Sequence, residues 1–214
     1  MNFRTLSALC VLALTISAAS GATFSNLGPI TIPAEGTSGP AAPYPSTINV
    51  AGLGSITSIT VDLFGFTHTF PDDVDILLVG PTGLSVILMS DVGGGFDVSG
   101  LNLTLDDSGA ALPDNEVLTS GIFQPTNVGT GDIFQAPAPA DPYGSLLASL
   151  IGSDPNGTWS LFVIDDVGAD VGSFSGGWAL NINDAPAAIP EPATTVLMAA
   201  GLALCALGLR RRKA

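Results

Sequence analysis

The sequence predicts an all-β fold, with one β-sandwich domain between two apolar ends. Short stretches in which apolar and polar residues alternate recur along the chain, and this is typical of strands with one buried face. The 26 glycines and 16 prolines supply frequent turns, and no long amphipathic helical pattern separates them. A chain of 214 residues has room for one sizeable core.

The first 22 residues have the pattern of a secretory signal peptide. Arg4 precedes an apolar run at residues 6–16, and small residues lead to a cleavage point after Ala22. A short buried helix is the alternative interpretation. The apolar run is too short to span a membrane stably, so a transmembrane helix is not expected here. Residues 23–45 contain five prolines and are expected to form an edge strand and a connector.

The sandwich itself is assigned to residues 46–183. Its predicted strands lie at residues 59–64, 74–79, 85–90, 101–105, 157–165 and 178–182. The fourth of these is expected to stop at Asp106, and the proline-rich stretch 108–142 is expected to be a long loop. Alternation puts Trp159 and Trp178 on the apolar faces of their strands, so both are expected in the core.

The C-terminal end has three parts in a fixed order. A proline-rich linker, residues 184–192, precedes an uncharged and mostly apolar stretch, and three arginines and a lysine follow. A helix over that stretch would be roughly 25 Å long, which is enough for a thin bilayer. Residues 193–214 are therefore predicted to be a single transmembrane helix with a cytoplasmic basic tail. The alternative, a buried terminal helix, leaves the basic tail unexplained.

Charge separates the ends of the chain from its body. All five basic residues lie in the two ends of the chain, at Arg4 and at residues 210–213. Of the 19 acidic residues, only Glu191 belongs to the C-terminal signal. So acidic a body repels nucleic acid and anionic lipid, and nucleic acid is excluded as a partner. Cys10 and Cys205 also lie in the ends, so we expect neither a disulfide nor thiol chemistry in the domain.

The three C-terminal parts together resemble the PEP-CTERM sorting domain. The residues that carry this resemblance are Pro190, Glu191, Pro192, Arg210, Arg211, Arg212 and Lys213. It implies a Gram-negative bacterium that makes an exopolysaccharide matrix. It also implies export through the inner membrane, a transient anchor there, and recognition by an exosortase. The body would then reach the cell surface or the medium.

The body resembles the P domain, or Homo B domain, of proprotein-convertase subtilases. The motifs that carry the resemblance are His68-Thr69-Phe70 with Asp73, Ile76, Leu78, Pro81 and Gly83, then residues 120–125, Gly157-Thr158-Trp159 and Trp178-Ala179-Leu180. Gln124 stands where that family usually has an arginine. The resemblance implies a jelly-roll β-sandwich that stabilises a catalytic neighbour in those proteases.

The inventory of side chains argues against an enzyme. Nucleophilic catalysis needs a base beside the nucleophile, and His68 is the one histidine of the chain. Neither a Gly-x-Ser-x-Gly elbow nor a Gly-Lys-Ser phosphate loop occurs. We therefore expect a structural role for His68 rather than general-base catalysis. Zinc is disfavoured too, because one histidine and no cysteine in the body cannot supply its usual ligands.

Calcium is the one cofactor that the residues favour. Carboxylates gather at three points, which are Asp72/Asp73/Asp75, Asp106/Asp107 and Asp165/Asp166/Asp170. Ca²⁺ prefers such oxygen ligands, although aspartate is also common in solvated turns. The first expected ligand is Asp73, which matches the P-domain motif. Asp165 and Asp170 come next, and Asp72 and Asp75 complete the candidate set.

Taken together, the sequence predicts an exported, non-catalytic β-sandwich protein of the bacterial envelope or exopolysaccharide matrix. The alternative is a calcium-dependent carbohydrate-binding or adhesive module. In that case exposed loop aromatics such as Phe96, Phe134 and Tyr143 would stack on sugar rings.

Overall fold

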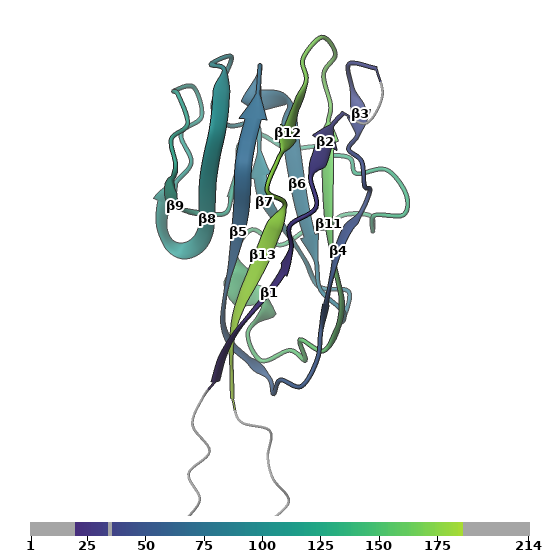
Figure 1. Ribbon diagram of the computed structural model, residues 1–214, viewed down its shortest axis with the longest axis vertical. Helices are drawn as coiled ribbons and strands as arrows, with labels where there is room; N and C mark the ends of the chain where they lie inside the picture. Colours follow the sequence, from purple (N-terminus) through teal and green to yellow (C-terminus); the bar gives the residue numbers. More distant parts are fainter. Residues whose placement is uncertain (1–19, 34–35, 186–214) are drawn as a thin grey trace, which may run out of the picture.

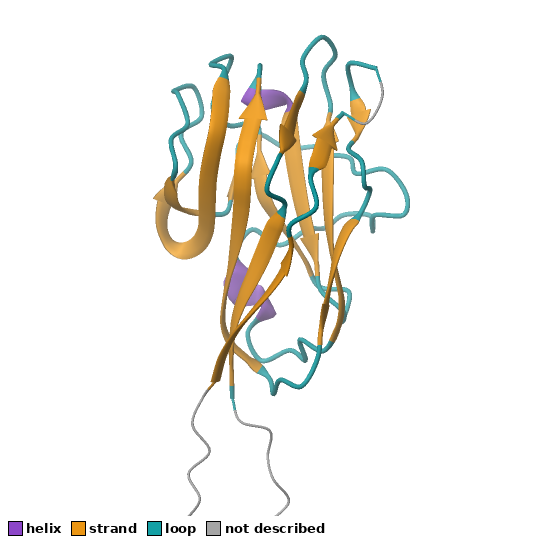
Figure 2. Cartoon of the chain, in the orientation of Figure 1, coloured by secondary structure: helices purple, strands orange, loops and turns teal. Residues whose placement is uncertain are grey.

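The computed structural model describes residues 20–33 and 36–185, and this part of the chain is built almost entirely of β-strands (Figure 2). Its helical segments are two short 3₁₀ helices, η1 (Pro71–Asp73) and η2 (Leu147–Leu150). No helix within the described residues is long and apolar enough to cross a membrane. The predicted transmembrane helix and nearly all of the predicted signal peptide lie outside the described residues.

Seven strands form the first sheet (Figure 1). Their order is β1–β13–β5–β12–β2, and β8 and β9 continue the sheet from β5. The strands are β1 (Ser20–Asn26), β2 (Ile30–Ile32), β5 (Ile56–His68), β8 (Val98–Ala111), β9 (Gly121–Gln124), β12 (Gly172–Phe174) and β13 (Trp178–Asp184). All neighbours pair antiparallel except β8 and β9, which pair in parallel.

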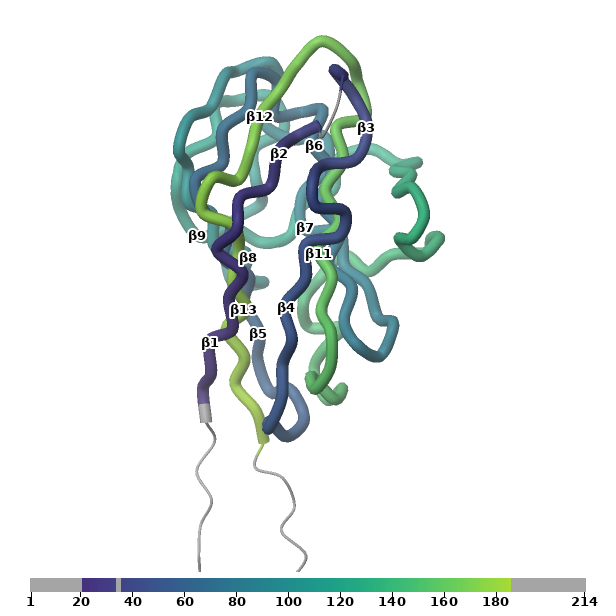
Figure 3. The backbone as a smooth tube through the Cα atoms, turned by 45° about the vertical axis from the view of Figure 1, so that its right-hand side comes forward, coloured from purple at the N-terminus to yellow at the C-terminus, as the bar shows by residue number. Residues whose placement is uncertain are grey.

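Six strands form the second sheet, in the order β10–β7–β6–β11–β3, with β4 also paired to β11. They are β3 (Gly39–Pro40), β4 (Ser46–Val50), β6 (Val74–Val79), β7 (Ser85–Ser90), β10 (Thr126–Asn127) and β11 (Gly157–Asp165). Figure 3 shows the two sheets as two layers that face each other. The all-β, two-sheet fold expected from the sequence is therefore confirmed.

The space between the sheets is filled by one apolar core. Residues of β5, β6, β11 and β13 that share a face by alternation meet there. Trp159 and Trp178 are both 0% exposed, as alternation predicts. Their indole N–H groups are satisfied, because Trp159 donates to the Pro155 carbonyl at 2.9 Å and Trp178 to Ser46 Oγ at 2.9 Å.

A second apolar cluster lies on the outer face of the second sheet. Leu77, Ile87 and Phe162 project from that face, and Phe134 from the long connection covers them. Strands β6 and β7 are therefore buried on both faces. This explains why residues 85–90 form a continuous apolar run instead of alternating.

Two expectations about the middle of the chain are wrong. Strand β8 continues past Asp106 to Ala111, because its last residues still pair with β9. Residues 108–142 are likewise interrupted by β9 and β10. Asp107 does not end the strand but accepts the backbone N–H groups of Leu147 and Ala148 at 2.9 and 2.7 Å, at the start of η2.

The two ends of the sandwich are formed by different parts of the chain. Ser20 pairs with Asp184, so β1 begins and β13 ends side by side at one end (Figure 1). The connections from β5 to β6 and from β11 to β12 lie at the opposite end (Figure 1). Because a cleavage after Ala22 would leave only Thr23–Asn26 of β1, part of this pairing would remain after processing.

Candidate functional site

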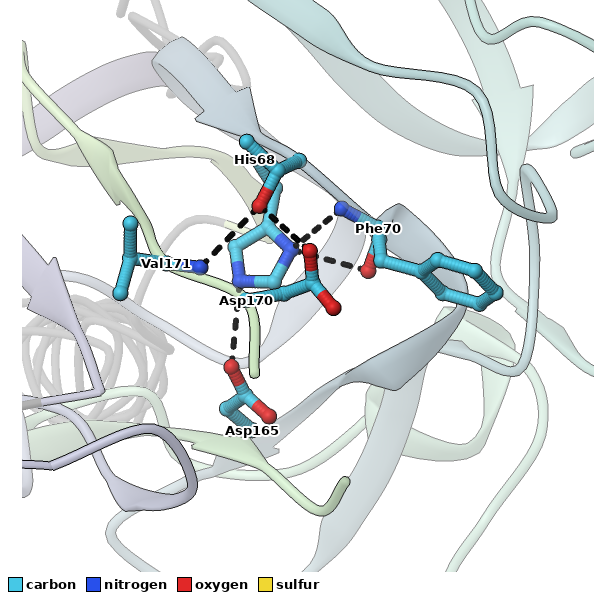
Figure 4. A network of polar contacts seen from close by, with 6 residues as sticks. His68, Phe70, Asp165, Asp170 and Val171 are labelled. Carbon is cyan, nitrogen blue, oxygen red and sulfur yellow. Dashed lines mark hydrogen bonds and ion pairs between the residues drawn. The ribbon is translucent and has the colours of Figure 1, made fainter. Parts of the chain in front are cut away.

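Two polar side chains meet inside the sandwich at the end opposite Ser20 and Asp184. His68 is the last residue of β5 in the first sheet, and Asp165 is the last residue of β11 in the second. His68 Nε2 lies 3.3 Å from Asp165 Oδ2, and both side chains are 0% exposed (Figure 4). Strand alternation explains the meeting, because Phe66 and Val163, two residues earlier in each strand, also face the core.

The imidazole of His68 is fixed from two sides. Its Nδ1 atom lies 2.8 Å from the Phe70 carbonyl oxygen and 3.2 Å from the Phe70 nitrogen (Figure 4). Gly172 of β12 pairs with His68 of β5, and a Cβ atom at Gly172 would collide with the imidazole ring. Burial lowers the pKa of His68, while the Phe70 carbonyl and the charge of Asp170 act in the opposite direction.

Asp165 is buried among other carboxylates. Burial is the largest cause that raises its pKa, to about 7, and the negative charge of Asp73 is the next. Within the described residues, no side chain donates a hydrogen bond to either Asp165 oxygen, while the backbone N–H of Val167 acts to lower the pKa of Asp165. The contact with His68 is thus an approach of 3.3 Å between Nε2 and Oδ2 without hydrogen-bond geometry.

Asp73 lies beside Asp165 because β6 and β11 are paired. Val74 is opposite Asp165 in the register, and the Asp73 carbonyl accepts the Asp166 N–H at 3.0 Å. The Asp73 side chain is 6% exposed. Its pKa is raised to about 6, first by burial and then by the charges of Asp166 and Asp170. We call Asp73, Asp165, Asp166 and Asp170 together the acidic end of the sandwich.

The other two predicted ligands at this end lie at its margin. Thr69 Oγ1 donates a hydrogen bond to Asp170 Oδ1 at 2.7 Å and accepts one from the Val171 N–H at 3.2 Å. This fixes the connection between β11 and β12 against the end of β5. Asp72 is half-buried in η1, next to Asp73.

Asp75 belongs to a different cluster, although it is only two residues from Asp73. It alternates with Val74 and Ile76 of the core, so it lies on the outer face of the second sheet. There it is 3% exposed, and burial raises its pKa to about 8. The charges of Asp166, Asp132 and Asp91 raise it further, while the Ser90 hydroxyl acts in the opposite direction.

Ser90 and Asn127 supply the hydrogen-bond donors of this outer cluster. Ser90 Oγ lies 2.9 Å from Asp132 Oδ1 and 3.3 Å from Asp91 Oδ2. Asn127 Nδ2 donates to Asp132 Oδ2 at 2.7 Å. Sequence reasoning missed Ser90, Asp91 and Asp132, because they come together from the end of β7 and from the long connection. The Ser90-Asp91 pair at the end of a predicted strand was the available signal.

The five candidate calcium ligands are therefore divided by the second sheet. The structure brings Asp73 and Asp165 together, puts Asp72 and Asp170 near them, and separates Asp75. Within residues 20–33 and 36–185, no three His, Cys, Asp or Glu side chains lie close enough together to hold a metal ion. Any metal site at the acidic end would need further oxygen ligands.

The aromatic residues of the alternative hypothesis are not equally exposed. Phe96 is 44% exposed. Phe134 is only 6% exposed and packs edge-on against Tyr143, with ring centroids 5.6 Å apart. The expectation that Phe134 is an exposed stacking residue is wrong, because it covers the outer apolar cluster.

One comparison with known proteins bears on the C-terminal end. Residues 188–213 match the model of the PEP-CTERM protein-sorting motif. The chain carries a PEP-CTERM sorting signal. This confirms the resemblance expected from the sequence and marks the chain for export and for recognition by an exosortase at the membrane. The PEP-CTERM match begins four residues after β13 ends. No curated protein shows significant similarity to the chain.

Proposed function

We propose that this chain is an exported, non-catalytic β-sandwich protein of the cell envelope or exopolysaccharide matrix. The observation that carries the proposal is the PEP-CTERM match at residues 188–213, directly after the folded domain. The exosortase is its processing partner, and the inner membrane holds it only transiently. After its release, the domain is proposed to lie in the exopolysaccharide matrix.

A P-domain-like jelly roll is the proposed family of residues 46–183. The two-sheet fold supports this, and so does the position of the motif residues. Trp159 and Trp178 of the closing motif lie in the core, and His68 of the first motif is fully buried.

The burial of His68 supports a role without catalysis. A general base must come within hydrogen-bonding distance of a substrate proton. His68 is 0% exposed, and both of its ring nitrogens already face protein atoms. A substrate could reach it only if the two sheets separated.

The direction in which the domain is presented follows from the position of the motif. The PEP-CTERM signal joins the domain at the end of β13, and the acidic end lies at the opposite end of the sandwich. A calcium-dependent carbohydrate-binding or adhesive module remains the second candidate, with Phe96 as its exposed aromatic residue.

Fractionation of producing cells with and without their exosortase tests the proposal. The released domain should appear in the medium or matrix only when the exosortase is present. Accumulation of the same released form in both strains would overturn it. Glycan-array binding by the released protein would favour the carbohydrate-binding module, and hydrolase activity that is lost in a His68→Gln variant would contradict the non-catalytic role.

A further inference from the structure

A hollow of about 250 Å³ opens on the outer face of the second sheet, over strand β7. Its lining includes Ile87 of β7, which is 4% exposed, and four side chains from the segment between β9 and η2. These four are Asn127, Asp132, Asp141 and Tyr143. Pockets for drug-sized ligands have volumes of about 300–1,000 Å³, so this hollow suits a smaller unit such as one sugar ring.

The hollow is preformed, because both of its sides are fixed to β7 by backbone hydrogen bonds. On one side, the Val128 N–H donates to the Ser90 carbonyl at 3.1 Å. On the other side, the Gly144 N–H donates to the Ser85 carbonyl at 2.8 Å, and the Gly144 carbonyl accepts the Ile87 N–H at 3.0 Å. A ligand that enters such a fixed hollow loses less binding free energy to the ordering of loops.

Tyr143 presents a fixed aromatic ring to the hollow. Its hydroxyl donates to the Pro139 carbonyl at 2.9 Å, and Phe134 packs edge-on against the ring, with the centroids 5.6 Å apart. Tyr143 is half-buried, so part of it stays accessible. An aromatic ring that is already held in place offers contact area at a low cost in conformational entropy. It is therefore suited to stack on the apolar face of a sugar ring.

The charged groups of the hollow are all negative. Asp132 is held by the Ser90 hydroxyl and the Asn127 amide, and each carboxylate oxygen can still accept a second hydrogen bond. Asp141 is exposed. Burial raises the pKa of Tyr143, and the charges of Asp141 and Asp132 raise it further, so both carboxylates act at the same ring. The body of the chain contains no lysine or arginine that could balance them.

We propose that this hollow binds one residue of an amino-sugar chain, with the pyranose ring on Tyr143 and its ammonium group beside Asp141. Asp132 accepts hydrogen bonds from the ring hydroxyls. The carboxylates attract a cationic sugar and repel a uronic acid or a phosphorylated sugar. Proximity of the ammonium group to the aromatic ring adds a cation–π contribution. The inference names the ligand class of the carbohydrate-binding candidate and therefore rests on the proposed function.

This site is distinct from Phe96, which lies in the connection between β7 and β8 and does not line the hollow. It uses only side chains of the protein, so binding should persist in the presence of a chelator. Binding by the purified protein is also independent of export. A failure to bind amino sugars would therefore leave the sorting of the chain by an exosortase untouched.

Calorimetric titration of the full chain, in a mild detergent with a chelator, tests the proposal. The probes are the hexamers of glucosamine, N-acetylglucosamine and galacturonic acid, at a pH at which the sugar amine is protonated. The glucosamine hexamer should bind about fivefold tighter than its acetylated counterpart, because acetylation removes the ammonium groups. The galacturonic acid hexamer should not bind. Hexalysine, a cation of similar charge without sugar rings, should bind more weakly than the glucosamine hexamer.

Two substitutions in the hollow and two outside it locate the site. Asp141→Asn should weaken binding of the glucosamine hexamer about two- to fivefold, and its exposed side chain can change without disturbing the core. Tyr143→Leu should weaken binding about fivefold, whereas Tyr143→Phe keeps the ring and should bind like the wild type. Asp154→Asn, which removes an exposed carboxylate just before β11, and Phe96→Ala should also bind like the wild type.

Equal binding of hexalysine and the glucosamine hexamer would overturn the proposal, because it would mean unspecific attraction between opposite charges. Equal affinity for the acetylated hexamer would overturn it as well. So would undiminished binding by Asp141→Asn, which decides the matter should Tyr143→Leu not fold. A loss of binding in Phe96→Ala would contradict the position of the site.

Discussion

His68 Nε2 and Asp165 Oδ2 lie 3.3 Å apart and join the last residue of β5 in the first sheet to the last residue of β11 in the second. This contact closes the apolar core at the acidic end. On the core side of this contact, Phe66 and Phe174 stack with their ring centroids 4.7 Å apart. The contact thus forms the boundary between an apolar interior and a group of carboxylates.

Removing one member of this pair should destabilise the domain strongly. His68→Leu removes the one basic side chain beside the buried Asp165 carboxyl group, and leaving a buried polar group without such a neighbour typically costs about 1–3 kcal/mol. The free energy of unfolding should be measured by urea denaturation in the presence of a chelator. The double variant His68→Leu/Asp165→Leu serves as the control, because it removes both polar groups together.

The double variant should be more stable than His68→Leu alone, since apolar pairs often replace buried ionic pairs without loss. The double-mutant cycle should therefore give an interaction energy of at least ~1 kcal/mol. Additive effects of the two substitutions would mean that His68 and Asp165 do not interact energetically.

In the absence of metal, stability should fall as the pH rises from 6.5 to 8.5. The pKa of Asp165 is raised to about 7 and that of Asp75 to about 8. A carboxyl group whose pKa is higher in the folded protein binds more protons there, so its contribution is lost as the pH passes that value. His68 has a lowered pKa, so its opposite effect is confined to pH values below its unfolded pKa of about 6.5.

Thermal unfolding in chelator at several pH values measures this loss, which should be on the order of 1–2 kcal/mol for Asp75 across the range. Asp75→Asn should flatten the profile, because asparagine does not titrate. A stability that rises steadily to pH 8.5 would contradict the proton binding assigned to these carboxyl groups.

The two core tryptophans should be essential for stability. Trp159→Ala and Trp178→Ala each remove a side chain that is 0% exposed and should cost about 3–5 kcal/mol through lost burial and a cavity. Trp178→Phe should cost less, although it leaves Ser46 Oγ without the indole donor. Urea denaturation of each variant measures the change, and Phe96→Ala on the surface is the control. Unchanged midpoints in both alanine variants would contradict the core assignment.

Alternation predicted the faces of the strands well, because it depends only on local geometry. Trp159 and Trp178 occupy the core positions that their periodicity indicates. Alternation failed at Asp106, where a continuing partner strand, β9, keeps β8 extended. Pairing of strands from distant parts of the chain leaves no such local signal.

The candidate site was only partly predictable for the same reason. Asp73 and Asp165 were recognised as separate acidic turns, but their meeting depends on the register between β6 and β11. Asp73 and Asp75 are only two residues apart, but the change from η1 to β6 at Val74 directs them to different clusters. The contact of His68 with Asp165 required the packing of two sheets.

The most direct test of the central claim, that this domain is exported and then released by an exosortase, is the intact mass of the protein collected outside producing cells. The account predicts a chain that starts near Thr23 and ends close to Pro190–Pro192, within the segment matched by the sorting motif. A released protein that still carries Arg210–Lys213 would contradict it.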